Sequence, residues 1–188
     1  MNLVIETDTQ RPSPQRIPAT ALVDVFCYTV VESALGEVLV ARSTKSVCSI
    51  LLGDDAEELA VDLANCFPLA VLIQSDATLK GDVAKILRYI ANPSEGLHLT
   101  LDMRGTPFQR RVWEKVKAIS VGRTVSYMEL AKWVAPLANP RAVAGACAAN
   151  PIALAIPCHR VVRKSGDLAG YRWGIERKRE LIRRETMA

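Results

Sequence analysis

One apolar segment, residues 151–162, constrains the fold of this chain more than any other part of the sequence. It reads Pro-Ile-Ala-Leu-Ala-Ile-Pro-Cys-His-Arg-Val-Val, so an apolar run between two prolines is followed at once by Cys158 and His159. A short apolar run bounded by prolines is typical of a buried strand. The segment therefore predicts a buried strand that carries a thiol and an imidazole to one place.

A thiol beside an imidazole is the usual material of cysteine chemistry, because the thiolate is the nucleophile. In an extended strand, however, the neighbours Cys158 and His159 point to opposite faces. Passing the thiol proton to the imidazole would then need a water molecule or a local turn. The alternative interpretation is an inert, buried structural cysteine with a chance histidine beside it.

Composition and charge limit the classes of protein that fit. The first twenty residues are polar, and no stretch approaches the ~18 apolar residues of a membrane span, so we expect a cytoplasmic protein without a membrane partner. The five cysteines form no C-x-x-C pair, so we expect no metal site, no cofactor and no disulfides. Residues 1–102 carry a net charge of −7 and residues 103–188 carry +11, which favours a polyanionic partner for the second half.

The first half of the chain predicts a small α/β domain at residues 21–102, preceded by a flexible tail at residues 1–20. Runs rich in Val, Leu and Ile predict a three-stranded antiparallel sheet, with Gly36 in its first turn. Helical spacing and proline stops predict two helices, and a last apolar run predicts one more strand. The expected strands are 22–31, 37–42, 46–52 and 97–101, and the expected helices are 54–66 and 76–90.

The second half, residues 103–188, predicts a mostly helical domain. Two capping boxes, Thr106-Pro-Phe-Gln109 and Ser126-Tyr-Met-Glu129, mark helix starts. The helices are expected at 107–119, 126–134, 140–149 and 175–184. The second and third of these, joined by a short link, form a helix-turn-helix pattern.

The helix expected at 140–149 has few side chains that could read bases. It offers Arg141 and otherwise small residues, among them Ala142, Gly145 and Ala148. Reading base edges in the major groove needs Asn, Gln, Arg or Lys along one face. The composition fits either a buried small-residue helix or a helix that docks in the minor groove and inserts Arg141 into the duplex while a base is extruded.

Several motifs together resemble the signature of the O6-alkylguanine-DNA alkyltransferases. They are Pro-Cys-His-Arg-Val at 157–161, Asn-Pro at 150–151 and Gly-Tyr-Arg-Trp-Gly at 170–174. The likeness is dense over residues 104–185 and weaker over 26–102, and within the family it is greatest to the carboxy-terminal half of the bacterial Ada proteins. It implies an RNase H-like N-terminal domain. It also implies a single-turnover, irreversible transfer of an alkyl group to Cys158 from O6-alkylguanine, or from O4-alkylthymine, in double-stranded DNA.

The resemblance also implies roles for individual residues. Glu185 would orient the His159 imidazole, although the sequence alone would favour an exposed helix-end glutamate. Asn150 would be a hinge or, on the simpler interpretation, a helix C-cap. Tyr127 would give a proton to guanine N3; on the simpler interpretation it is an interfacial aromatic residue. The substrate-binding residues would be Tyr127, Cys158, Val161, Tyr171 and Arg172, and the DNA-binding residues Arg141, Ala142, Gly145, Ala148, Ser126 and Tyr127.

Two other classes of function stay open at this point. A helix-turn-helix DNA-binding or lesion-recognition protein without catalysis would not need Cys158. A cysteine hydrolase would need an oxyanion hole, and the sequence around Cys158 has no glycine to help form one. No protein partner is implied, and we expect a monomer.

Overall fold

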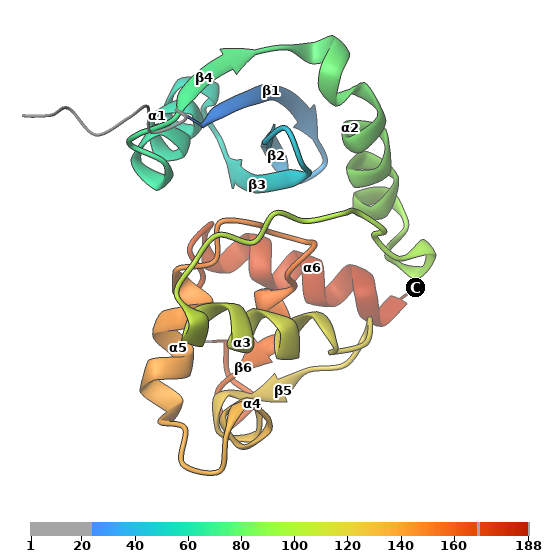
Figure 1. Ribbon diagram of the computed structural model, residues 1–188. Helices are drawn as coiled ribbons and strands as arrows, with labels where there is room; N and C mark the ends of the chain where they lie inside the picture. The colour runs from blue at the N-terminus through green and yellow to red at the C-terminus, as the bar shows by residue number, and fades with distance from the viewer. Residues whose placement is uncertain (1–23, 169, 188) are drawn as a thin grey trace, which may run out of the picture.

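The structure, a computed structural model, describes residues 24–168 and 170–187. Figure 1 shows two parts, a sheet with two helices and, beside it, a mostly helical part that ends in α6. The tail expected at residues 1–20 lies outside the described residues. No helix in the described part of the chain combines the length and apolar character that a membrane crossing needs.

The sheet has four strands in the order β3-β2-β1-β4. The antiparallel meander β1 (Val25–Ser33), β2 (Gly36–Arg42) and β3 (Val47–Gly53) confirms the three predicted strands. Gly36 stands in the first turn with φ +89°, and a Cβ there would lie 2.5 Å from the Gly53 carbonyl oxygen. The fourth strand, β4 (Val71–Gln74), pairs parallel with β1 and was not predicted.

Two helices accompany the sheet, close to their predicted bounds. Helix α1 (Ala56–Cys66) is capped by the Asp55 carboxylate, which accepts from the Glu58 amide. Helix α2 (Asp76–Ala91) packs on the sheet and is followed by a short 3-10 turn, η1 (Pro93–Glu95). In Figure 1 the C-terminal end of α2 lies beside the second part of the molecule.

The second part contains the four predicted helices: α3 (Pro107–Lys117), α4 (Tyr127–Val134), α5 (Pro140–Ala148) and α6 (Ile175–Met187). Both capping boxes are formed, at the starts of α3 and α4. The buried Trp113 of α3 donates from its indole to the Ala146 carbonyl of α5 at 2.8 Å, which ties these helices together. Helix α6 runs three residues beyond its predicted end, so Glu185 lies inside it.

The strand predicted at residues 97–101 is wrong, because only Leu101 forms an isolated bridge, to Val47. The free edge of β3 is shared between two segments. At Val47 it pairs with residues 100–102, and at Ile50 it pairs with residues 151–153. Neither segment has enough of the edge to extend into a strand.

The strand predicted in residues 151–156 is also wrong. Ile152 makes one bridge to Ile50, and the chain then folds into turns in which the Ile156 amide donates to the Ile152 carbonyl at 3.1 Å. Leu154 takes a φ of +65°, which no regular strand allows. The prolines at both ends lack the N–H groups that a ladder needs. Within residues 151–162, the one strand is β6 (Val161–Val162), which pairs in parallel with β5 (Val125–Ser126).

Candidate active site

Cys158 begins a single 3-10 turn, η2 (Cys158–Arg160), at the end of the folded loop. Its side chain is almost fully buried, with 4% of the residue exposed. The Asn150 amide nitrogen donates to its sulfur at 3.3 Å. Cys158 and His159 therefore lie in a turn and not in an extended strand, and both side chains are buried.

Asn150 organises the loop that carries the thiol. It follows the end of α5 and is fully buried. Its side-chain oxygen accepts from the Ile152 amide at 2.9 Å, and its nitrogen donates to the Ile156 carbonyl at 2.9 Å as well as to Cys158. The Asn150 side chain thus supplies hydrogen bonds that strand pairing would otherwise give this loop, and it fixes the position of the sulfur relative to α5.

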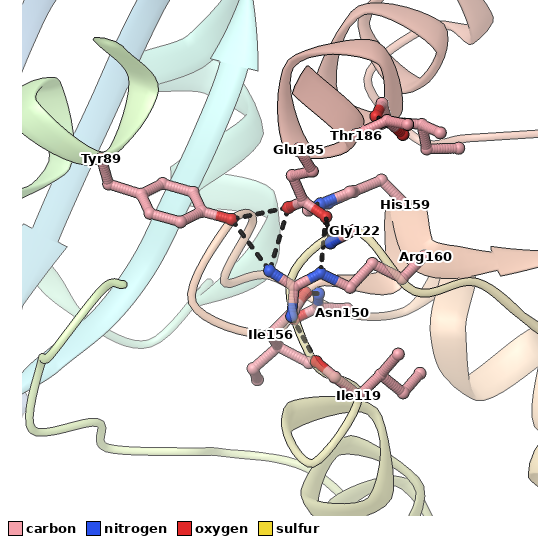
Figure 2. Close-up of polar contacts among 10 residues, drawn as sticks. Tyr89, Ile119, Gly122, Asn150, Ile156, His159, Arg160, Glu185 and Thr186 are labelled. Atoms are coloured by element: carbon pink, nitrogen blue, oxygen red, sulfur yellow. Dashed lines mark hydrogen bonds and ion pairs between the residues drawn. The ribbon is translucent and has the colours of Figure 1, made fainter. Parts of the chain in front are cut away.

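Glu185 is the partner of His159, as the resemblance implies, with 2.7 Å between its Oε1 and the imidazole Nε2. The sequence alone favoured an exposed glutamate, and that interpretation is wrong because Glu185 is 5% exposed. Its carboxylate accepts five hydrogen bonds in all, and Figure 2 shows Arg160 and Tyr89 beside it. The donors are His159, Tyr89, the Arg160 Nε and Nη2 groups, and the Gly122 amide.

These contacts set the protonation states of the buried groups. Burial alone would raise the pKa of Glu185, but the hydrogen bonds from His159 and Arg160 lower it to about 2. Burial lowers the pKa of His159, against the pull of Glu185, so the imidazole is neutral at pH 7. Burial raises the pKa of the Cys158 thiol to about 11, although the Asn150 bond and the Lys178 charge act against this. At rest the site therefore holds a thiol, a neutral imidazole and a carboxylate.

The short β5–β6 pairing brings Tyr127 and Val161 to the same region as the thiol. Val161 follows η2 and pairs with Val125, while Tyr127 begins α4 directly after β5. Burial, with Cys147 and Cys158 nearby, raises the pKa of Tyr127 to about 12, so its phenol keeps its proton. The carbonyl of Val161 accepts from the buried Lys178 Nζ at 2.6 Å.

Tyr171 stands beside the imidazole. Its ring lies edge-on to His159 with 6.4 Å between ring centroids, and it also meets Trp173 edge-on at 5.1 Å. Its hydroxyl is buried without a hydrogen-bond partner among the described residues, as is the Trp173 indole nitrogen. The exposed Arg172 side chain instead reaches the first part of the chain, donating to the Cys66 sulfur at 3.2 Å.

Four of the six predicted DNA-binding residues lie away from the buried groups around Cys158 and Glu185, whereas Tyr127 lies near the thiol. These four are exposed on α5: Arg141, Ala142, Gly145 and Ala148. A Cβ added at Gly145 would meet nothing within 4 Å, so this face of the helix is open. Ser126 is different, because it is nearly buried and its hydroxyl accepts from the Glu129 amide as the cap of α4.

Sequence reasoning missed four residues that contact Glu185 or lie beside the thiol site: Tyr89, Gly122, Arg160 and Lys178. Arg160 belongs to the Pro-Cys-His-Arg-Val motif, and its place beside His159 is a signal that could have indicated its role. Tyr89 comes from α2, in a half of the chain to which no chemistry was assigned. In the part of the chain described here, no group of three His, Cys, Asp or Glu side chains is placed to hold a metal ion.

Comparisons with known proteins give the chain a family. Residues 107–187 match the family profile described as 6-O-methylguanine DNA methyltransferase, DNA binding domain. The bifunctional transcriptional activator/DNA repair enzyme Ada of Escherichia coli is 45% identical over 85% of this chain, which spans 45% of that protein's length. The inducible methylated-DNA–protein-cysteine methyltransferase of Bacillus subtilis is 36% identical over 70% of this chain and 74% of its own.

Comparison with solved structures points to the same family. The crystal structure of the O6-methylguanine methyltransferase of Mycobacterium tuberculosis superposes with a TM-score of 0.72 at 31% identity, over 86% of this chain and 93% of that one. A structure of the M. tuberculosis protein in complex with DNA gives a TM-score of 0.70 at 30% identity, over 87% and 93% of the two chains. The chain therefore belongs to the family of methylated-DNA–protein-cysteine methyltransferases.

Proposed function

We propose that this protein repairs DNA by moving an alkyl group from O6-alkylguanine, or from O4-alkylthymine, to the sulfur of Cys158. The observation that carries the proposal is the buried thiol, fixed by Asn150 and adjacent to the His159–Glu185 pair. A soft, polarisable sulfur suits displacement at an sp³ carbon. The S–C bond forms as the C–O6 bond breaks, and the electron pair remains on the guanine, which takes up one proton overall.

Proton movement is the part of the reaction that needs the buried cluster. With a pKa of about 11, the Cys158 thiol must give up its proton as it attacks. The Nδ1 atom of His159 is buried without a partner among the described residues, so it is free to accept that proton through a water molecule. Glu185, ionised at neutral pH, would stabilise the imidazolium that results. Tyr127 keeps its own proton and would donate to guanine N3.

We propose that α4 and α5 form a helix-turn-helix whose α5 docks in the minor groove. The exposed small residues of α5, with open space at Gly145, would let its backbone approach a narrow groove. Such a surface has no set of side chains for reading a sequence, so affinity would come from phosphate contacts. Because a base inside a duplex cannot reach a buried thiol, the nucleotide would be flipped out, with Arg141 filling the gap.

Stoichiometry tests the proposed reaction. A transferred alkyl group makes a thioether that no neighbouring group can hydrolyse, so each molecule should react once. Incubation with duplex DNA containing O6-methylguanine should add one methyl mass to the intact protein, on the peptide that holds Cys158. Product well beyond one equivalent would contradict the single-turnover mechanism. Bound DNA without added mass would favour a non-catalytic module, and released methanol would favour a hydrolase.

Arg141 provides a separate test of base flipping. Arg141→Ala should slow repair of duplex DNA by roughly 10- to 100-fold, since losing a stacking group costs about 1–3 kcal/mol. Reaction with the free O6-alkylguanine base should be unaffected because nothing has to be extruded. Rates on both substrates would be compared with those of Arg111→Ala, which removes an exposed arginine of α3. Equal losses on the two substrates would assign Arg141 a structural role instead.

The remaining proposals concern organisation. We infer two domains, at residues 21–102 and 103–188, of which the first is RNase H-like. The sheet order β3-β2-β1-β4, with only β4 parallel to β1, supports this assignment. We also propose that the protein acts as a monomer in the cytoplasm, which is consistent with five cysteines that are all free.

A further inference from the structure

Tyr89 is the one donor to Glu185 that comes from the first part of the described chain. It lies in the last turn of α2, 96 residues from Glu185 in sequence, and is 2% exposed. Figure 2 shows its ring reaching from α2 toward the carboxylate, with its hydroxyl between Glu185 and Arg160. The hydroxyl donates to Glu185 Oε1 at 2.8 Å and accepts from Arg160 Nη2 at 3.1 Å.

The atom that Tyr89 contacts matters for the chemistry. Oε1 is the same carboxylate oxygen that holds the His159 Nε2. Burial, with Glu185 nearby, raises the pKa of Tyr89, so its hydroxyl stays protonated and remains a donor at neutral pH. The phenol therefore limits both the orientation of the carboxylate and the share of its charge that reaches the imidazole.

The end of α2 is also tied to α6 independently of Tyr89. Arg184, the neighbour of Glu185, donates to the carbonyl of Ile90, the neighbour of Tyr89, at 3.0 Å. The 3-10 turn η1, directly after α2, packs against α6 as well. Two adjacent residues of α2 thus meet two adjacent residues of α6, which holds the phenol at a fixed distance from the carboxylate.

We propose that Tyr89 is a positioning residue for alkyl transfer, holding Glu185 and through it His159 from across the junction between the two parts of the chain. The inference rests on the proposed function and adds to it a role for the first part. The sheet and α2 would then be needed to orient the His159 imidazole for proton transfer, as well as to support the fold of the second part. The Tyr89 hydroxyl contacts Glu185 and Arg160, so it would act on the thiol only through Glu185 and His159.

Tyr89→Phe tests the proposal, because it removes one hydroxyl and keeps the ring that fills the space. Alkyl transfer to Cys158 from duplex DNA should slow by about tenfold, because the Glu185 carboxylate and the His159 imidazole would no longer be held in one orientation. The affinity for DNA should be unchanged. Without the phenol donor, Oε1 would stabilise the imidazolium more strongly, so the pKa of His159 should rise. The acidic limb of the rate profile should then move to higher pH.

Histidine NMR gives a readout that a purely structural role would not move. The chain has two histidines, and His98 is exposed in the segment before α3, so it serves as an internal reference. The matched control is Tyr28→Phe, which removes the hydroxyl of a half-buried tyrosine that has no side-chain hydrogen bond to any described residue. We expect the His159 titration to shift in Tyr89→Phe and to stay at the wild-type position in Tyr28→Phe.

The outcomes separate this inference from the function on which it rests. If wild-type protein takes up one alkyl group and Tyr89→Phe reacts at the same rate with the same His159 titration, the positioning role is overturned while the transfer reaction stands. If the wild-type protein takes up no alkyl group, the proposed function fails first. Thermal melts of each variant verify that rates are compared between folded proteins, and a slower rate with an unshifted His159 titration would also overturn the proposal.

Discussion

Replacement of Cys158 by serine is expected to abolish alkyl transfer while leaving the affinity for duplex DNA unchanged. A serine hydroxyl ionises at a far higher pH than a thiol and is much less polarisable, so we expect the rate to fall at least about a thousandfold. The fold should tolerate the change, since Asn150 can donate to the new hydroxyl as it does to the sulfur. The exposed residues of α5 proposed to bind DNA are untouched. Transfer would be followed by intact mass and DNA binding by fluorescence anisotropy.

The matched control for this experiment is Cys147→Ala. Cys147 is a second buried cysteine of the same part, and burial raises the pKa of its thiol as well. We expect Cys147→Ala to accept one alkyl group on Cys158 as the wild type does. Alkylation of Cys158→Ser at an undiminished rate would rule out Cys158 as the acceptor, whereas loss of label in Cys147→Ala alone would transfer that assignment to Cys147.

Local signals in the sequence predicted the helices well. The capping boxes at Thr106 and Ser126 depend on residues only three positions apart, and both form as expected. The failures involve the edges of the sheet. Strand β4 has four residues, and its parallel partner β1 lies more than forty residues earlier, so no local pattern could reveal the pairing. The segments at 97–101 and 151–156 have the apolar character of strands, but they compete for a single edge of β3.

The residues of the site also differ in whether a local sequence pattern could reveal them. Cys158 and His159 are adjacent, and their motif was visible in the sequence. Glu185 was reached only through the family resemblance, because a glutamate near the end of a basic helix looks solvent-exposed. Its burial depends on Arg160 and on Tyr89, which approaches from a helix almost a hundred residues away. A contact between two helices that are remote in sequence leaves no periodicity to read, so the role of the first part could not be predicted.

Removing the charge of Glu185 should have the largest effect on stability. In Glu185→Gln the Arg160 guanidinium would stay buried without its anion, and losing one partner of such a pair costs about 3–5 kcal/mol. This is a large share of the roughly 5–15 kcal/mol by which domains are stable. Urea unfolding at pH 7 would measure the loss. The control is Glu176→Gln, which removes an exposed carboxylate from the same helix and should leave the midpoint unchanged.

The pKa shifts of Glu185 and His159 predict how the free energy of unfolding changes with pH. The folded pKa of Glu185 is about 2, below its value of about 4.5 in the unfolded chain, so its contribution is complete above pH 4.5 and is lost as pH falls toward 2. That shift corresponds to about 3 kcal/mol. The folded pKa of His159 is also lowered, so the unfolded chain takes up a proton first, and stability begins to fall below about pH 6.5. Wild-type protein should therefore lose stability steadily from pH 6.5 into acid, while Glu185→Gln should lose less below pH 4.5. The difference between the two unfolding free energies should narrow as pH falls, and a constant difference from pH 7 to pH 3 would show that the Glu185 carboxylate carries no such linkage.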